Sequence, residues 1–164
     1  MKCANLHGIN DLRYEDIPKP ECKDDQVLVQ VKNCGICGSD IPRVYSKGTY
    51  YFPTVIGHEF SGKVVFDPMN ELTGKKVAVF PLLPCFQCDS CKAGNYATCE
   101  HYDYYGSRRN GGMSEFIAIM RYARDYSLTL RERMLWIALF YAANDRAVYN
   151  EHTQEYDWPD GFFQ

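Results

Sequence analysis

The sequence predicts a mainly β domain with a cysteine-rich loop and an appended helical tail. Residues 1–120 contain short apolar segments separated by turn-forming residues, four cysteines crowd between residues 85 and 99, and the composition changes near residue 120. A chain of 164 residues is long enough for one domain with a substantial core but marginal for two. We therefore expect one main domain, residues 1–120, and a separate tail, residues 121–164.

Five segments of the main domain are expected to be β-strands. They are Met1–His7, Val27–Val31, Phe60–Phe66, Lys76–Phe80 and Ser114–Met120. In the second segment, valines at 27, 29 and 31 alternate with Leu28 and Gln30, which is typical of a strand with one face in the core. Gly74 supplies a turn into the fourth segment.

The tail differs from the domain in composition. It has no Cys or Lys, a single glycine at Gly161, and both tryptophans of the chain. The segment Thr129–Glu132 has the spacing of a helix capping box and leads into the apolar stretch Met134–Ala143, so we expect one helix over about Leu130–Tyr149. Because this stretch is apolar nearly all round, it must pack on the β domain, on a second copy of the chain or on a partner.

Composition and charge argue against several classes of protein. Apolar residues make up 46% and charged residues 24%, as in ordinary soluble domains. With a net charge of −3, the chain has no excess of basic residues to bind a phosphate backbone, so we do not expect a nucleic-acid binder, including one of the zinc-ribbon type.

Membrane contact is not expected either. No apolar run approaches the about 20 residues that cross a bilayer, and no export signal is recognised, so we expect a cytoplasmic protein. No glycine-rich phosphate loop, and hence no cofactor-binding residue, can be identified.

The strongest chemical signal is the cysteine cluster Cys85, Cys88, Cys91 and Cys99. Its C-x2-C-x2-C-x7-C spacing lets four thiolates converge on one ion. Sulfur-only ligation with no open position is typical of a structural zinc site. Unpaired or disulfide-bonded cysteines are the alternative, but disulfides are uncommon in proteins that are not exported.

A weaker pattern lies upstream of this cluster. The segment Cys34-Gly-Ile-Cys37-Gly-Ser-Asp40 follows a predicted strand, and Gly57-His58-Glu59 precedes another. A catalytic zinc needs only three protein ligands, and Cys37 and His58 would supply two. By themselves, a buried cysteine and a hydrogen-bonded histidine are the more common explanation of such a pattern.

Taken together, CGICGSD, GHEFSG, the four-cysteine loop and GGMSEF resemble the GroES-like catalytic domain of zinc-dependent medium-chain alcohol and polyol dehydrogenases. The segments FPLLPCFQC and YYGSRRNGG resemble the galactitol-1-phosphate 5-dehydrogenase branch in particular. The resemblance covers residues 1–120. It implies an irregular, partly open β-barrel that oxidises a secondary alcohol of a polyol or polyol phosphate to a ketone, with NAD or NADP as acceptor.

The resemblance also implies roles for individual residues. Cys37 and His58 would bind the catalytic zinc, with Glu59 as an alternate ligand or beside it. Ser39 would contact the substrate alcohol and begin proton removal, although it could equally cap the helix expected at Asp40. Arg108 and Arg109, in a glycine-flanked loop, would suit a sugar phosphate, although a solvated loop is the simpler interpretation.

The chain departs from the family pattern after residue 120. No segment matches the family's third catalytic ligand, and the nucleotide-binding Rossmann domain is absent. We therefore expect a truncated enzyme, inactive as this chain alone, whose tail fits a fusion or frameshift product. The alternative is a non-catalytic zinc-binding module whose tail helix docks on a partner.

Overall fold

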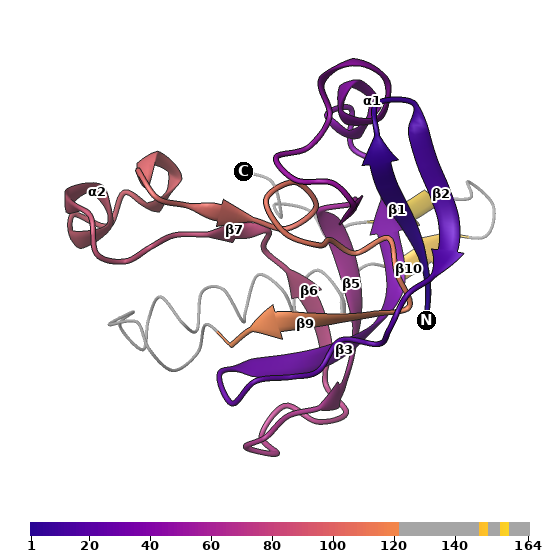
Figure 1. Ribbon diagram of the computed structural model, residues 1–164. Coiled ribbons are helices and arrows are strands. Elements are labelled where there is room, and N and C mark those ends of the chain that lie inside the picture. Colours follow the sequence, from indigo (N-terminus) through magenta and orange to yellow (C-terminus); the bar gives the residue numbers. More distant parts are fainter. Residues whose placement is uncertain (122–147, 151–154, 158–164) are drawn as a thin grey trace. The chain divides into compact units, whose positions relative to one another are not determined.

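The computed structural model describes residues 1–121, 148–150 and 155–157. The chain divides into two units, Met1–Arg121 and Tyr122–Gln164, and each is described by itself. Figure 1 shows the first unit as a set of antiparallel strands with short helical turns between them.

Three sheets make up the first unit. The first has the order β2-β1-β4 and contains β1 (Lys2–Gly8), β2 (Asp11–Asp16) and β4 (Thr54–Val55). The second has the order β6-β5-β3-β9 and contains β3 (Gln26–Gly35), β5 (Glu59–Phe66), β6 (Lys76–Val79) and β9 (Phe116–Met120). The third pairs β7 (Leu82–Leu83) with β8 (Asp103–Tyr104). An isolated bridge between Cys3 and Ser114 connects the first sheet to the chain before β9.

The predicted fold class is confirmed, because the described strands form a mainly β domain that does not close into a barrel. All five predicted strands are present. The sequence did not predict β2, β4, β7 and β8, which are short or rich in charged residues. The expected alternation in β3 is wrong at Leu28, which is buried like Val27 and Val29; the pairing with β5 is irregular at this point, where the register shifts between Leu28 and Val29.

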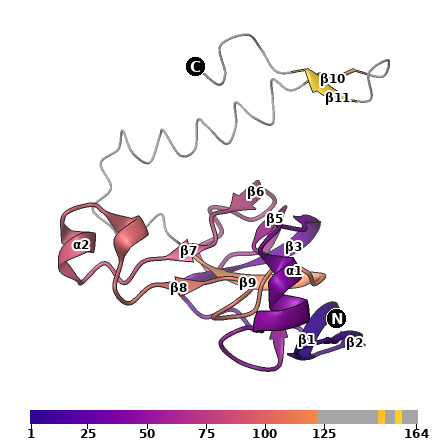
Figure 2. The ribbon, with the colours of Figure 1, turned by 90° about the horizontal axis from the view of Figure 1, so that it is seen from above.

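The helical segments of this unit are all short. They are α1 (Asp40–Pro42), the π-helical turn η1 (Arg43–Lys47), α2 (Asp89–Lys92) and the 3-10 turn η2 (Tyr96–Thr98). In both views of the ribbon, the segment that carries α2 projects away from the sheets (Figures 1 and 2). Among the residues that the structure describes, no helix is long and apolar enough to cross a membrane.

A small core anchors the turn that carries the upstream site. Val44 of η1 is buried with Leu6 of β1 and Ile56, and Met113 packs against this cluster. The backbone N–H of Met113 donates to the carbonyl of Ile56, and that of Ala4 donates to the carbonyl of Met113. The segment after Cys37 is thus held against the chain that precedes His58.

In the second unit, the structure describes only an antiparallel pair, β10 (Val148–Asn150) with β11 (Glu155–Asp157). The predicted helix over 130–147 lies outside the described residues. Its predicted end is wrong at Val148 and Tyr149, which form a strand, in keeping with the strand preference of β-branched and aromatic side chains.

Candidate metal centres

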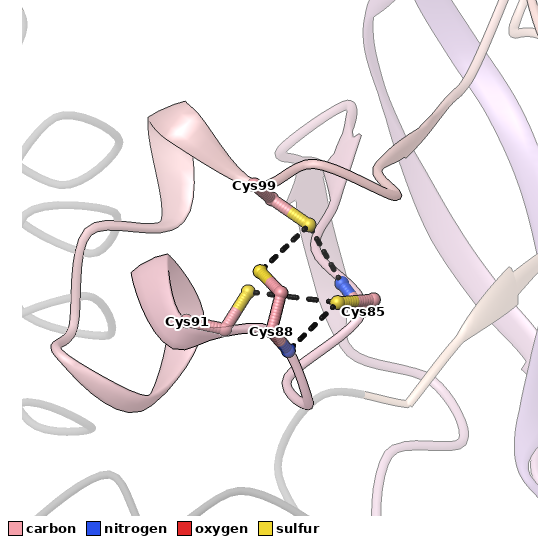
Figure 3. A group of neighbouring side chains, drawn as sticks. All are labelled: Cys85, Cys88, Cys91 and Cys99. Carbon is pink, nitrogen blue, oxygen red and sulfur yellow. Dashed lines mark hydrogen bonds between the residues drawn. The ribbon is translucent and has the colours of Figure 1, made fainter.

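The four cysteines of the projecting segment converge on one point. Cys85 precedes α2, Cys88 is its N-cap, Cys91 lies within it and Cys99 follows η2. Their Sγ atoms all lie within 4.8 Å of one another. Figure 3 shows the four side chains directed toward a common point. Two short helical turns on a single loop therefore bring together four sulfur ligands, the donor set of a closed tetrahedral zinc site.

Backbone N–H groups also point at these sulfurs. Cys85 Sγ accepts from the N–H groups of Gln87 at 3.5 Å and Cys88 at 3.4 Å, and Cys99 Sγ accepts from the N–H of Cys85 at 3.2 Å. The N–H groups of Gln87 and Cys88 lower the pKa of Cys85 to about 6, whereas burial raises that of Cys91 to about 12. Four neighbouring thiolates repel one another unless a cation lies between them, so the donor set fits a zinc ion.

A second group joins Cys37, His58 and Glu59. One sulfur, one imidazole nitrogen and one carboxylate oxygen lie within 4.8 Å of one another. Cys37 lies between β3 and α1, His58 is buried, and Glu59 begins β5. Three mixed ligands are what an open zinc site requires, and the group includes the Glu59 carboxylate, for which the sequence left two roles open.

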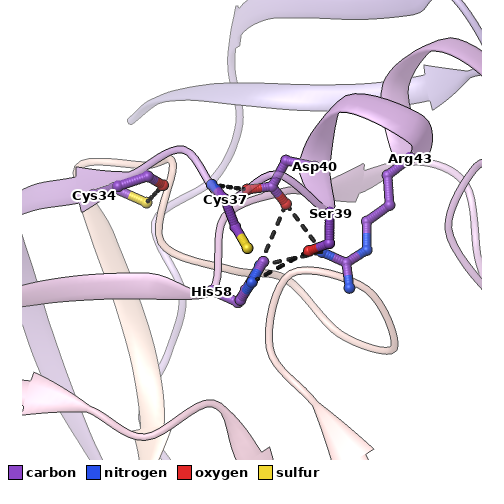
Figure 4. Close-up of polar contacts among 7 residues, drawn as sticks. Cys34, Cys37, Ser39, Asp40, Arg43 and His58 are labelled. Atoms are coloured by element: carbon purple, nitrogen blue, oxygen red, sulfur yellow. Dashed lines mark hydrogen bonds and ion pairs between the residues drawn. The ribbon is translucent and has the colours of Figure 1, made fainter.

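Two residues that the sequence did not single out orient this group. Asp40, only 2% exposed, has Oδ1 at 3.3 Å from His58 Nδ1, and its Oδ2 accepts from the Cys37 N–H at 3.0 Å. Arg43 Nη1 donates to Asp40 Oδ1 at 3.0 Å and lies 3.1 Å from His58 Nδ1. Figure 4 shows Asp40 between the Cys37 backbone and the His58 ring. The sequence feature that could have indicated this contact is the three-residue spacing between Asp40 and Arg43, an acidic and a basic residue that can pair on one helical turn.

Ser39 lies beside His58 and Arg43. Its Oγ is 3.5 Å from His58 Nε2 and accepts a hydrogen bond from Arg43 Nη1 at 3.1 Å (Figure 4). Ser39 is the N-cap of α1, but its side chain makes no capping hydrogen bond. The capping alternative is therefore wrong, because the hydroxyl turns toward His58 instead.

Cys34 does not join either group. Burial raises the pKa of its thiol to about 11, and its Sγ contacts the carbonyl of Gly35. A redox-active C-x-x-C motif needs a thiol of low pKa. The environment of Cys34 is that of a packing residue.

The loop that follows β8 lies beside His58. The Tyr104 ring packs on the His58 ring with a centroid separation of 5.7 Å. Gly106 and Gly111 lie so close to Gly57 that an added Cβ would come within 2.6 and 2.0 Å of the Gly57 carbonyl oxygen. Glycine is required at both positions because another residue would push this loop away from the site.

The two arginines of this loop are in different environments. Arg109 Nε donates to Asp103 Oδ2 at 2.6 Å, so its charge is paired within the loop. The Arg108 guanidinium lies over two tyrosine rings, at 4.0 Å from the Tyr50 centroid and 4.4 Å from that of Tyr102. The structure thus separates two residues that the sequence grouped as one candidate site.

The fold and these two groups define a class of protein, a mainly β domain with a closed four-sulfur site and an open Cys-His-Glu site. A family model described as the alcohol dehydrogenase GroES-like domain matches residues 23–124, more than half of the chain. The chain belongs to this family of zinc-dependent dehydrogenases.

Relatives of the chain include dehydrogenases named for polyols and polyol phosphates. The chain is 46% identical over 106 residues to galactitol 1-phosphate 5-dehydrogenase of Escherichia coli K12, covering 62% of this chain and 31% of the relative. It is 46% identical over 112 residues to sorbitol dehydrogenase of Bombyx mori, covering 63% and 32%. The crystal structure of galactitol-1-phosphate dehydrogenase from Escherichia coli matches with a TM-score of 0.70 and 41% identity, over 74% of this chain and 36% of that chain. The chain therefore spans about a third of the length of these relatives.

Proposed function

We propose that this chain is the metal-binding and substrate-binding part of a polyol or polyol-phosphate dehydrogenase that oxidises a secondary alcohol to a ketone, with NAD or NADP as hydride acceptor. The observation that carries the proposal is the convergence of Cys37, His58 and Glu59, with the Ser39 hydroxyl beside His58. The similarity to polyol dehydrogenases supports the choice of substrate class.

The two groups have separate tasks in this proposal. Cys85, Cys88, Cys91 and Cys99 would hold a structural zinc, and Cys37 and His58, with Glu59 as the third donor, would hold the catalytic one. When bound at an open site, zinc acts as a Lewis acid that lowers the pKa of an alcohol. The Ser39 hydroxyl would relay the alcohol proton, accepting it on Oγ as its own proton passes to water, while a hydrogen bond from Arg43 Nη1 holds Oγ in place.

Asp40 supports this arrangement without touching a substrate. Its carboxylate faces His58 Nδ1 and accepts the N–H of Cys37, so one buried side chain orients two of the proposed ligands. A carboxylate in this position favours the tautomer that carries its proton on Nδ1 and leaves the Nε2 lone pair free.

Cobalt substitution tests the proposal, because Co²⁺ reports its ligands by absorption. We expect galactitol or galactitol 1-phosphate to change the absorption of cobalt-substituted protein, and this response to be lost in Cys37→Ser and kept in Cys88→Ser. The matched control is Cys22→Ser, a half-buried cysteine outside both groups. An absorption spectrum that polyols leave unchanged in all of these proteins would contradict the proposal.

A further inference from the structure

We infer that Arg108, together with Tyr50 and Tyr102, forms a phosphate-recognition site beside the Cys-His-Glu group, so that the substrate is a polyol phosphate rather than a free polyol. The inference rests on the proposed function and makes it more specific. The relatives do not decide this point, because proteins named for a polyol phosphate and for a free polyol are each 46% identical to the chain.

The first argument is that Arg108 carries an uncompensated charge. Arg109, its neighbour, is paired with Asp103, but no carboxylate contacts Arg108 within the described part of the chain. Burial alone would lower the pKa of Arg108, but hydrogen bonding to Tyr102 and Tyr50 raises it, so the guanidinium stays protonated. The Arg108 Nε is buried and has no hydrogen-bond partner among the described residues. A cation that the fold holds without an anion is suited to an anionic ligand.

The second argument is that this cation is held in a fixed orientation. The rings of Tyr50 and Tyr102 both lie at cation–π distance from the guanidinium, which restricts the orientations that it can adopt. The N–H of Tyr50 donates to the carbonyl of Ser107 at 3.1 Å, which ties the segment before β4 to the arginine loop. Tyr50 is 60% exposed, so the cluster lies at the surface, where a ligand can reach it.

The third argument is that the cluster lies close to the proposed reaction site. The N–H of Arg108 donates to the carbonyl of Tyr104 at 3.0 Å, and the Tyr104 ring packs on His58. Tyr104 therefore connects the backbone of the arginine loop to the ring of His58. A phosphate monoester is the substrate group that matches a planar, fixed guanidinium with two tyrosine hydroxyls beside it.

Ligand binding to the zinc-loaded chain tests this inference without requiring turnover. Dissociation constants for galactitol 1-phosphate, galactitol and adenosine 2′-phosphate would be measured by calorimetry on the native protein and on Arg108→Ala, Arg108→Lys and Arg13→Ala. Arg13 is the control because it is an arginine of β2 paired with Asp11, away from both metal groups. Near-ultraviolet circular dichroism would verify that each variant is folded.

We expect the native protein to bind galactitol 1-phosphate more tightly than galactitol, and Arg108→Ala to lose on the order of tenfold or more in affinity for the phosphate alone. Arg108→Lys should recover only part of the loss, because lysine keeps the charge without the planar pair of donors, and Arg13→Ala should bind as the native protein does. Equal affinities for galactitol and its phosphate would overturn the inference and leave the proposed function intact. Binding of adenosine 2′-phosphate alone through Arg108 would assign the cluster to a nucleotide and also overturn it. If neither polyol ligand binds, the proposed function fails with it.

Discussion

The carboxylate of Asp40 lies 3.3 Å from Nδ1 of His58, and both side chains are almost fully buried. The two residues are eighteen positions apart; Asp40 begins α1, and η1 and β4 lie between it and His58. Their contact joins two separate sequence motifs, CGICGSD and GHEFSG, in one site and fixes the orientation of the His58 ring.

Replacing Asp40 by Asn should weaken metal binding at the Cys-His-Glu group by about tenfold or more, because the neutral amide no longer favours the Nδ1 proton on His58. The measurement is a competitive zinc titration with a chromophoric chelator. Asp24→Asn, at an exposed position before β3, is the matched control and should not change the affinity. Unchanged affinity in folded Asp40→Asn would show that Asp40 is only a packing residue.

Replacing Cys88 by Ser should remove one of two zinc ions per chain, because the projecting segment has four sulfur donors and no fifth to substitute. Native mass spectrometry would count the ions. The loop should also become sensitive to protease, since zinc binding contributes folding free energy to so small a structure. Cys22→Ser should keep both ions, and a Cys88→Ser protein that also keeps both would contradict the structural site.

Replacing Gly111 by Ala should destabilise the domain by roughly 1–3 kcal/mol, because the new Cβ would lie 2.0 Å from the Gly57 carbonyl oxygen. The loop that carries Tyr104 and Arg108 would have to move away from His58. Urea unfolding measures the change, and Gly8→Ala, whose Cβ would meet no atom within 4 Å, should differ little from the native protein.

The buried pair of Asp67 and Arg121 should make the domain sensitive to acid. Arg121 Nη1 donates to Asp67 Oδ1 at 2.7 Å. Burial favours the neutral form of Asp67, but the N–H groups of Leu72, Met69 and Glu71 and the charge of Arg121 outweigh it and lower the pKa. A carboxyl whose pKa is lowered on folding stabilises the protein fully above its unfolded pKa of about 3.9, and this stability is lost as the pH falls through the folded pKa.

Asp67→Asn should therefore cost roughly 1–3 kcal/mol near neutral pH, since it removes the buried partner of Arg121 and leaves only the exposed carboxylate of Glu71, whose Oε2 lies 2.6 Å from Nη2. It should also flatten the fall of stability below about pH 4. The free energy of unfolding in urea, measured across this range, tests both effects. Asp24→Asn serves again as the exposed control. If the free energy of unfolding of Asp67→Asn falls with pH as steeply as that of the native protein, carboxyl groups other than Asp67 cause the fall.

Much of the fold could be predicted because its signals are local. Alternating or continuous apolar runs marked the strands β1, β3, β5, β6 and β9, and Gly74 marked a turn that the structure confirms with a positive φ. The strands β4, β7 and β8 have only two residues each, too few for a periodic pattern, and their pairing depends on partners distant in the chain. The predicted end of the tail helix is wrong at Val148 because this residue pairs with β11, and such strand pairing cannot be recognised from local helix signals.

The sequence by itself determined which residues carry ligand chemistry. Four cysteines on one loop can reach a common ion wherever the loop lies, and Cys37, His58 and Ser39 stand in motifs whose resemblance to a family is itself a property of the sequence. Only the tertiary structure decided how these residues are oriented. It placed the Asp40 carboxylate against His58, turned the Ser39 hydroxyl away from its cap, and paired Arg109 with Asp103 while leaving Arg108 between two tyrosine rings. Such contacts depend on distances between segments far apart in the chain, and packing in three dimensions sets those distances.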